Sequence, residues 1–365
     1  MVLLPKPGPS PDSPSAYRPV CLLDGVGKLL ERLAATRLES HLFRSVPGLH
    51  DSQSGFRRER STADAVARVR SVVDGAERRG YVALAVSLDV VNAFNSIPWD
   101  RIRRALEPPH RALAYLRGVV RAFLWDRSIA YTVRGGRMIE RAVYRGVPQG
   151  SVLGPLLWNI AYDAVLRVPM PLDSALVCYA DDTLALVWGA AWDGTVLLAE
   201  LAVARVVAAI KGLGLRVSRE KSEAIWFCRR ADHGTPPAGC RLRLEGAEIE
   251  VGTGMKYLRL TLDSHWTFRV HFERRAPSVE AAANALGRLL PRLGGPGVGV
   301  RRLYAGVVRA RLLYGAPIWA KDLMASRCSL LNVRRLHRTV AIRVVRGFRT
   351  ISAAAAVVLA GFPPL

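Results

Sequence analysis

The chain has 365 residues, half of them hydrophobic, and its 53 Lys and Arg residues outnumber 30 Asp and Glu residues, giving a formal net charge of +23. A chain with this much apolar surface can bury a core, which excludes an intrinsically disordered protein, and its length fits two or three domains of roughly 150 residues. The positive charge predicts a polyanionic partner, either nucleic acid or an acidic membrane face, unless it serves solubility alone.

Apolar patterns predict helices in the first part of the chain and a buried strand after them. The first 16 residues are rich in Pro and Ser, which predicts an extended lead-in. Residues 24–41 and 62–74 repeat apolar side chains at helical spacing and predict two helices. Residues 81–89 form a short apolar run that ends in a carboxylate, as expected of a buried strand. We further expect helices over 99–106 and 111–125, and a hairpin of strands 129–133 and 138–144.

An acidic hairpin is predicted in the middle of the chain. Residues 152–166 have helical spacing, and the apolar runs 175–179 and 183–188 enclose Asp181 and Asp182 at a hairpin tip. Further along, we expect a helix over 195–213 ended by Gly214, three short strands within 241–262, and helices from Ser278 to near the end. The predicted fold class is therefore α+β, with a catalytic body followed by a basic helical unit.

The positive charge is concentrated near the C-terminus. Between Arg288 and Arg349 the sequence has 14 Lys or Arg residues against one acid, Asp322. Basic side chains recur there among apolar ones, which predicts helices with one core face and one phosphate-facing face. A membrane is the rival partner, but the apolar stretch 351–362 is shorter than the roughly 20 residues that span a bilayer. We therefore predict a nucleic-acid partner and no membrane partner.

The cysteines and the first residues bear on the compartment. The five cysteines are scattered and never form a CxxC pair, so neither a disulfide framework nor a zinc site is predicted. The start has no long apolar run before its prolines, which argues against a signal peptide. We expect a reducing, intracellular location.

Three carboxylates lie at predicted strand ends within apolar surroundings. Asp89 closes one run, and Asp181 and Asp182 interrupt another. Because a buried unpaired charge is very costly, such carboxylates must be paired or must bind cations. Oxygen ligands of this kind suit Mg²⁺, and two such ions can activate an attacking 3′-hydroxyl and stabilise a leaving pyrophosphate. For the Asp-Asp pair alone, a solvated turn is the alternative.

Ordered motifs around these acids resemble a known family. Tyr179-Ala180-Asp181-Asp182 resembles the YxDD box of reverse transcriptases. The other motifs, in family order, are Tyr17-Arg18-Pro19-Val20, Gly55-Phe56-Arg57 with Arg60-Ser61-Thr62, Ser87-Leu88-Asp89 with Asn92-Ala93-Phe94, Gly146-Val147-Pro148-Gln149-Gly150-Ser151, and Gly214-Leu215 with Lys221 and Lys256-Tyr257-Leu258. The chain resembles the reverse transcriptases of non-LTR (LINE-like) retrotransposons and, in residues 153–159 and 341–361, the type that inserts into arthropod ribosomal-RNA genes.

The resemblance implies a right-hand polymerase fold with fingers, a palm with an antiparallel sheet and a helical thumb. The expected parts are fingers at 1–80, palm at 81–105 and 146–252, a fingers insertion at 106–145, a primer-grip hairpin at 253–270, and a basic helical thumb at 271–365.

The resemblance also implies the roles of the acidic residues and of one lysine. Asp89 and Asp181 would ligate two Mg²⁺ ions, with Mn²⁺ as a substitute, and Asp182 would be a weaker ligand. Val90 would lend its backbone carbonyl. Lys221 would lie near the pyrophosphate as a general acid, unless it is an exposed charge at a strand start.

Further positions match nucleotide-binding residues of the family. Phe94 would lie beneath the incoming sugar and select deoxynucleotides, unless it is a core ring at a helix start. Gln149 and Gly150 would contact the nucleotide from a turn. Tyr179 would line the site beside the primer end. Arg57 and Arg60 resemble the arginines that hold the triphosphate, although Arg58 between them leaves the choice open.

The C-terminal part would hold the primer and template. Tyr257 and Leu258 match the primer grip, but Arg259 follows where the family usually has Gly. If that position needs a positive φ, Arg costs roughly 1 kcal/mol or more. The predicted contacts to the nucleic-acid backbone are Arg301, Arg302, Arg309, Arg334, Arg335 and Arg338.

The function expected from these observations is RNA-directed DNA polymerisation by a transposable element. Its substrates would be dNTPs, an RNA template and a DNA primer at a nicked target, and it would act in the nucleus. The chain would be a fragment of a Pol polyprotein whose endonuclease lies elsewhere. The alternatives are an RNA-dependent RNA polymerase, against which Phe94 and the finger motifs argue, and an inactive remnant that binds nucleic acid without polymerising.

Overall fold

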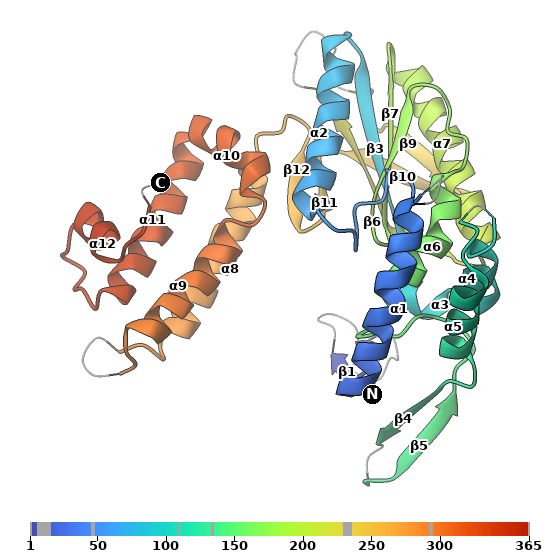
Figure 1. The fold of residues 1–365 in the computed structure, drawn as a ribbon. Coiled ribbons are helices and arrows are strands. Elements are labelled where there is room, and N and C mark those ends of the chain that lie inside the picture. Colours follow the sequence, from blue (N-terminus) through green and yellow to red (C-terminus); the bar gives the residue numbers. More distant parts are fainter. Residues whose placement is uncertain are drawn as a thin grey trace. The chain divides into compact units, whose positions relative to one another are not determined.

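A mixed six-stranded sheet carries the predicted strand-end carboxylates. Figure 1 shows the fold of the chain as a ribbon. The computed structural model describes residues 2–5, 16–44, 48–108, 110–132, 135–228, 236–291 and 295–363. The chain divides into two compact units, the first of residues 1–226 and 230–252 and the second of residues 227–229 and 253–365.

The sheet lies in the first unit, and its strand order is β6-β7-β3-β8-β10-β9. Neighbours pair antiparallel in β6·β7, β7·β3 and β10·β9, whereas β10 runs parallel to β8. The expected antiparallel palm sheet thus has one parallel pair. The strands are β3 (Val82–Val90), β6 (Ser174–Tyr179), β7 (Asp182–Gly189), β8 (Val217–Phe227), β9 (Arg241–Leu244) and β10 (Ala247–Gly252).

Helices cover the central strands because these strands are apolar on both faces. Residues 82–86 of β3 are all buried, as expected of a strand covered on both sides. Helices α2 and α7 both pack against β3 and β7. The helices of this unit are α1 (Gly25–Arg44), α2 (Thr62–Arg78), α3 (Ala93–Ser96), α4 (Trp99–Ala105), α5 (Ala114–Leu124), α6 (Gly154–Leu166) and α7 (Trp192–Gly212).

Two hairpins complete the first unit. β1 (Val2–Pro5) pairs with β2 (Tyr17–Val20), and β4 (Ser128–Thr132) pairs with β5 (Met138–Ala142). The second hairpin was predicted. The first was not, because the expected extended lead-in has no second apolar run to mark a partner strand, and residues 6–15 lie outside the described residues.

The second unit combines a short hairpin with helices around an aromatic core. Trp266, Phe268, Phe272 and Trp319 are buried, and the Phe272 and Trp319 rings meet edge to face at 5.0 Å. Its elements are β11 (Gly254–Tyr257), β12 (Leu260–Asp263), α8 (Arg269–Gly287), α9 (Val298–Leu312), α10 (Ala316–Ala325), α11 (Arg327–Val344) and α12 (Ala353–Leu359).

The α+β fold class is confirmed, but some predicted elements were wrong. Residues 241–263 form four strands instead of three. α8 begins at Arg269, before the predicted Ser278, and contains Pro277. β8 spans Val217–Phe227, so Lys221 lies inside a strand and not at a strand start; the charged residues 219–221 interrupt the apolar pattern on the exposed side. In the described part of the chain, no helix is both long and apolar enough to cross a membrane.

Candidate functional site

Strand pairing brings Asp89, Asp181 and Asp182 to one end of the sheet. In β3 and β7, Leu88 pairs with Thr183, so Asp89 follows at the level of Asp182. Tyr179 pairs with Asp182, which leaves Ala180 and Asp181 as a two-residue turn between β6 and β7. Of these two turn residues, Ala180 has a positive φ of 60°. The three acids therefore come from two adjacent strand ends and one tight turn.

The local electrostatics oppose full ionisation of this group. Burial raises the pKa of Asp181, and the charge of Asp89 raises it further. The pKa of Asp182 is raised to about 6, first by burial and then by the charges of Asp181 and Asp89. Asp182 is exposed to solvent, but the protein atoms around it screen its charge less than bulk water does, which favours the neutral form.

Lys221 lies beside this group. It comes from β8, the strand next to β3, and its Nζ is 3.8 Å from Oδ2 of Asp89. Its side chain is 73% exposed, so the pair is a surface contact and Lys221 can turn toward a ligand. The structure thus places the predicted lysine next to the first predicted metal ligand.

The three carboxylates fit a hard divalent cation. Burial and mutual repulsion raise two of their pKa values, and a cation would remove both costs. Among the described residues, no group of three or more His, Cys, Asp or Glu side chains is placed so as to hold a metal ion. Mg²⁺ keeps several waters and takes further oxygens from substrate phosphates, so the three carboxylates would supply only part of its ligands.

Backbone hydrogen bonds bring Phe94 and the 146–149 segment together. Val147 N donates to Phe94 O and Gly146 N donates to Ile97 O, both at 2.7 Å. Gly146 has a positive φ of 82°, and a Cβ there would stand 2.7 Å from Asn95 O. The Phe94 ring packs 4.9 Å from the Trp158 ring and 5.9 Å from Phe56. Phe94 is therefore held in a fixed position.

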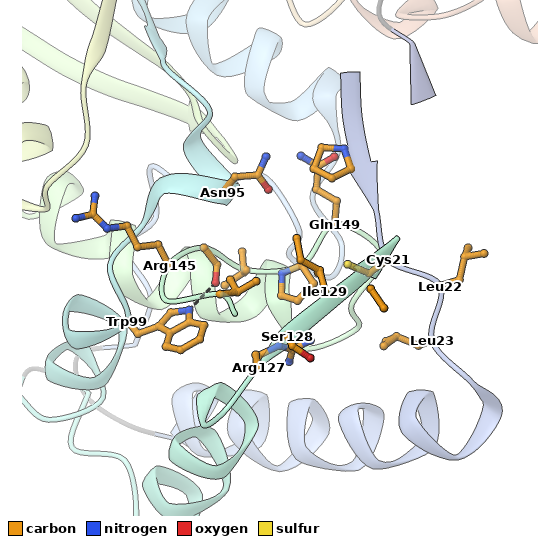
Figure 2. A pocket seen from close by; sticks show the side chains of 16 residues that line it. Cys21, Leu22, Leu23, Asn95, Trp99, Arg127, Ser128, Ile129, Arg145 and Gln149 are labelled. Carbon is orange, nitrogen blue, oxygen red and sulfur yellow. Dashed lines mark hydrogen bonds between the residues drawn. The ribbon is translucent and has the colours of Figure 1, made fainter. Parts of the chain in front are cut away.

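Gln149 lines a cavity of about 490 Å³ (Figure 2). Asn95, Trp99 and Ile129 line it too, and Trp99 Nε1 donates to the carbonyl of Gly146. Cys21 N donates to Gln149 O at 2.8 Å, and a Cβ at Gly150 would stand 2.4 Å from Cys21 O. The glycine thus allows the close backbone contact that fixes the turn carrying Gln149.

Arg57 and Arg60 face their own loop, whereas Arg58 faces α1. Arg57 Nη1 donates to His50 O (2.9 Å), and Arg60 forms a salt bridge with Asp51 at 2.7 Å. The bond from Arg60 lowers the pKa of the Asp51 carboxyl. Arg58 pairs with Glu39 at 3.3 Å and is 81% exposed. To bind a triphosphate, Arg57 and Arg60 would each have to give up these partners.

Two buried residues that support the site were missed by sequence analysis. Gln53 binds the backbone of Ala180 with its side chain. Glu31 accepts from Ser151 Oγ and from the N–H groups of Val152 and Leu153, and so caps the start of α6. Neither residue belongs to a pattern of spacing, because each acts through a segment distant in sequence.

The predicted primer-grip residues lie in the second unit. Tyr257 and Leu260 pair across a two-residue turn in which Leu258 and Arg259 both have positive φ, 46° and 65°. Tyr314 Oη donates to Leu258 O at 2.9 Å. Arg259 thus stands at a positive φ, which is the condition under which its cost was expected.

The expectation that Arg301 contacts nucleic acid is wrong. Arg301 is 1% exposed, and its guanidinium donates to the carbonyls of Pro291, Pro296 and Arg343. Arg301 therefore lies on the buried side of α9, and its hydrogen bonds connect α9 to the segments that contain these carbonyls. Of the other five, Arg302, Arg334 and Arg335 are exposed.

The last two predicted arginines are partly engaged. Arg309 lies over the Phe362 ring at 4.9 Å. Arg338 Nη2 donates to the carbonyls of Arg349 and Ile351. Both are half-buried, so their role as backbone contacts stays a prediction.

Comparisons with known proteins agree with the motifs. The family model described as "Reverse transcriptase (RNA-dependent DNA polymerase)" matches residues 4–261. "Probable RNA-directed DNA polymerase from transposon BS" of Drosophila melanogaster is 30% identical over 327 residues, 87% of this chain and 35% of that protein. The Pol polyprotein of the type-1 retrotransposable element R1 of Bradysia coprophila is 27% identical over 96% of this chain and 34% of its own length. The chain thus spans about a third of the length of these relatives.

The solved structures that resemble the chain include telomerases. The apo telomerase of Candida tropicalis has a TM-score of 0.47 and 11% sequence identity, over 87% of this chain and 55% of that one.

Proposed function

The chain belongs to the reverse transcriptase family, and from this premise we propose that it is the RNA-directed DNA polymerase of a non-LTR retrotransposon. The observation that carries the proposal is the convergence of Asp89, Asp181 and Asp182 at one end of the sheet. Two of their pKa values are raised, as expected of carboxylates arranged for cations.

The proposed reaction is nucleotidyl transfer from a dNTP to a primer 3′-hydroxyl. Asp89 and Asp181 would hold two Mg²⁺ ions, with Mn²⁺ as a substitute, and Asp182 and the Val90 carbonyl would complete the oxygen ligands. When bound, the two ions supply the positive charge that activates the hydroxyl and stabilises the leaving pyrophosphate. Lys221, 3.8 Å from Asp89, would donate a proton to that leaving group.

The nucleotide would lie between the palm and fingers segments of the first unit. Phe94, held against Trp158, would exclude a 2′-hydroxyl, and Gln149 and Gly150 would contact the nucleotide from the adjoining turn. Tyr179 would face the primer end. Arg57 and Arg60 would leave their carbonyl partners to bind the triphosphate as bidentate donors.

The second unit would hold the template and primer. Tyr257 is 2% exposed and Leu258 9%, so the backbone of their turn, and not their side chains, would contact the primer. The exposed arginines Arg302, Arg334 and Arg335 would contact phosphates without reading sequence. In this proposal the template is element RNA, the primer is a nicked genomic strand, and the reaction takes place in the nucleus.

Primer extension tests this function. The full chain is given a DNA primer on an RNA template with Mg²⁺, and dNTPs are compared with rNTPs. The proposal expects extension with dNTPs. Preferential use of rNTPs would support an RNA polymerase instead, and salt-sensitive RNA binding without any extension would support a nucleic-acid-binding remnant.

A further inference from the structure

The buried side chain of Gln53, which has no expected role in the reaction, binds the turn between β6 and β7 that contains Asp181. Gln53 is 1% exposed. Its Oε1 accepts from the N–H of Ala180 (2.8 Å) and of Gly55 (2.9 Å), and its Nε2 donates to Ala180 O (3.1 Å). Both backbone polar groups of Ala180, the residue before Asp181, therefore bind the same amide.

The backbone around Gln53 grips the same hairpin. Ser54 N donates to Cys178 O and Cys178 N donates to Ser52 O, each at 2.8 Å, in an isolated parallel bridge. A Cβ on Gly55 would stand 2.2 Å from Ala180 N, so a larger residue would push the turn away. The approach of the two segments thus depends on glycine at this position.

The gripping segment is itself anchored to α6. Asn159 Nδ2 donates to Gly55 O at 2.8 Å. Asp163, one turn further along α6, accepts from His50 N at 2.7 Å. Because α6 is a buried helix, these bonds fix the segment 50–55 against a rigid support.

The turn needs such a hold from outside. Ala180 adopts a positive φ, which disfavours residues with a Cβ. The charges of Asp89, Asp181 and Asp182 also repel one another and favour separation of the strand ends. An unsupported turn would relax both strains and move Asp181.

Gln53 also connects the turn to the arginine loop, residues 57–60. Its backbone carbonyl accepts from Arg57 Nη1 (3.3 Å) and Arg60 Nη1 (3.1 Å). One residue thus joins the segment proposed to bind the triphosphate to the turn proposed to bind metal.

We propose that Gln53 is a positioning residue that holds Asp181 in place for the divalent cations. This inference rests on the function proposed above for the metal ligands. Outer groups that orient a metal ligand change metal affinity or activity by about 10- to 100-fold when removed.

Three variants of the full chain test the proposal. Gln53→Met keeps similar bulk but removes the amide, and Gly55→Ala pushes the turn with all hydrogen-bonding groups present. Gly118→Ala, in α5, is the matched control, because a Cβ there meets nothing within 4 Å. For each variant we would measure kcat, the KM for dNTP and the Mg²⁺ concentration for half-maximal extension. Mn²⁺ affinity would be measured separately by electron paramagnetic resonance without nucleic acid.

We expect the half-maximal Mg²⁺ concentration and the Mn²⁺ Kd to rise about 10-fold in Gln53→Met and Gly55→Ala, with a lower kcat and little change in KM. Gly118→Ala should match the wild type. Loss of activity in proportion to the unfolded fraction, at unchanged Mg²⁺ and Mn²⁺ dependence, would overturn the proposal, as would failure of both variants to fold. If the wild type does not extend primers, the proposed function fails, while the Mn²⁺ affinities still decide the role of Gln53.

Discussion

At the residue scale, Phe94 is an aromatic ring that packs against neighbouring rings. Trp158 lies 4.9 Å from it, and the backbone of Phe94 is tied to Val147. A ring fixed in this way can discriminate by steric exclusion, because it cannot move away from an added hydroxyl.

Phe94→Val should weaken selection against ribonucleotides. The shorter side chain leaves room for a 2′-hydroxyl, and we expect the ratio of kcat/KM for dNTP over rNTP to fall about 10-fold or more. Single-nucleotide incorporation opposite an RNA template measures this ratio. Phe272→Val, in the aromatic core of the second unit, is the control for a lost packed ring, and an equal change in both variants would contradict the role of Phe94.

Residues in the motifs could be identified from sequence, whereas their supporting partners could not. Asp89 and Asp181 lie at the ends of apolar runs, and a carboxylate in that position is easily recognised in the sequence. Gln53 and Glu31 act through hydrogen bonds to segments more than 100 residues away, so no local pattern marks them. Arg301 shows the opposite error, since a basic residue at helical spacing was assigned to the surface but is buried.

At the element scale, the β11–β12 turn carries two residues with a Cβ at positive φ. Leu258 and Arg259 have φ values of 46° and 65°. Such a turn favours glycine, because a Cβ approaches the backbone oxygen in this conformation.

Arg259→Gly should therefore stabilise the protein. We expect the free energy of unfolding to rise by about 1 kcal/mol. The relief of backbone strain in the folded protein should outweigh the stabilisation of the unfolded chain by the extra conformational entropy of glycine. Urea denaturation measures the change. Arg274→Gly within helix α8 is the matched control and should lose about 1 kcal/mol, because glycine is a poor helix former. Destabilisation by Arg259→Gly would show that this turn is not strained.

The contact between α8 and β12 contains a buried neutral histidine. His271 is 3% exposed, and its Nδ1 accepts from Thr261 N at 3.2 Å. Burial, and then the charge of Arg275, lowers the pKa of His271 to about 4. In the unfolded chain the pKa returns to about 6.5, so acid protonates the unfolded state first.

Stability from His271 should therefore be complete above pH 6.5 and be lost as pH falls toward 4. The slope expected from this one group is at most about 1.4 kcal/mol per pH unit. His271→Asn retains an acceptor for Thr261 N but does not titrate, so its unfolding free energy should depend less on pH over this range. Equal pH dependence of the two proteins, measured by denaturation from pH 4 to 7, would refute the argument.

At the scale of the whole molecule, the chain has the right-hand polymerase fold of its family, with its positive charge gathered in the C-terminal helices. The α+β class followed from the predicted helices and strands, and the right-hand polymerase fold from the resemblance that the motifs carry. A catalytic body followed by a basic helical unit was expected too. The mixed strand order was not, because it depends on pairing between segments far apart in the sequence.

Neutralising Arg302, Arg334 and Arg335 together should weaken RNA binding and its dependence on salt. Each phosphate contact releases counterions, so the slope of log Kd against log salt should decrease by about three or less. Fluorescence anisotropy with a labelled RNA–DNA duplex at several salt concentrations measures the slope. An unchanged slope would mean that these exposed arginines do not contact the nucleic-acid backbone.

The central claim is that the three strand-end carboxylates perform nucleotidyl transfer on an RNA template. The most direct test compares wild type with Asp181→Asn, in Mg²⁺ and dNTPs, for extension of a DNA primer on RNA. We expect extension by the wild type and a loss of at least about 100-fold in Asp181→Asn, with duplex binding retained, because a metal ligand is removed without a change in shape. Extension by Asp181→Asn at the wild-type rate would contradict the account.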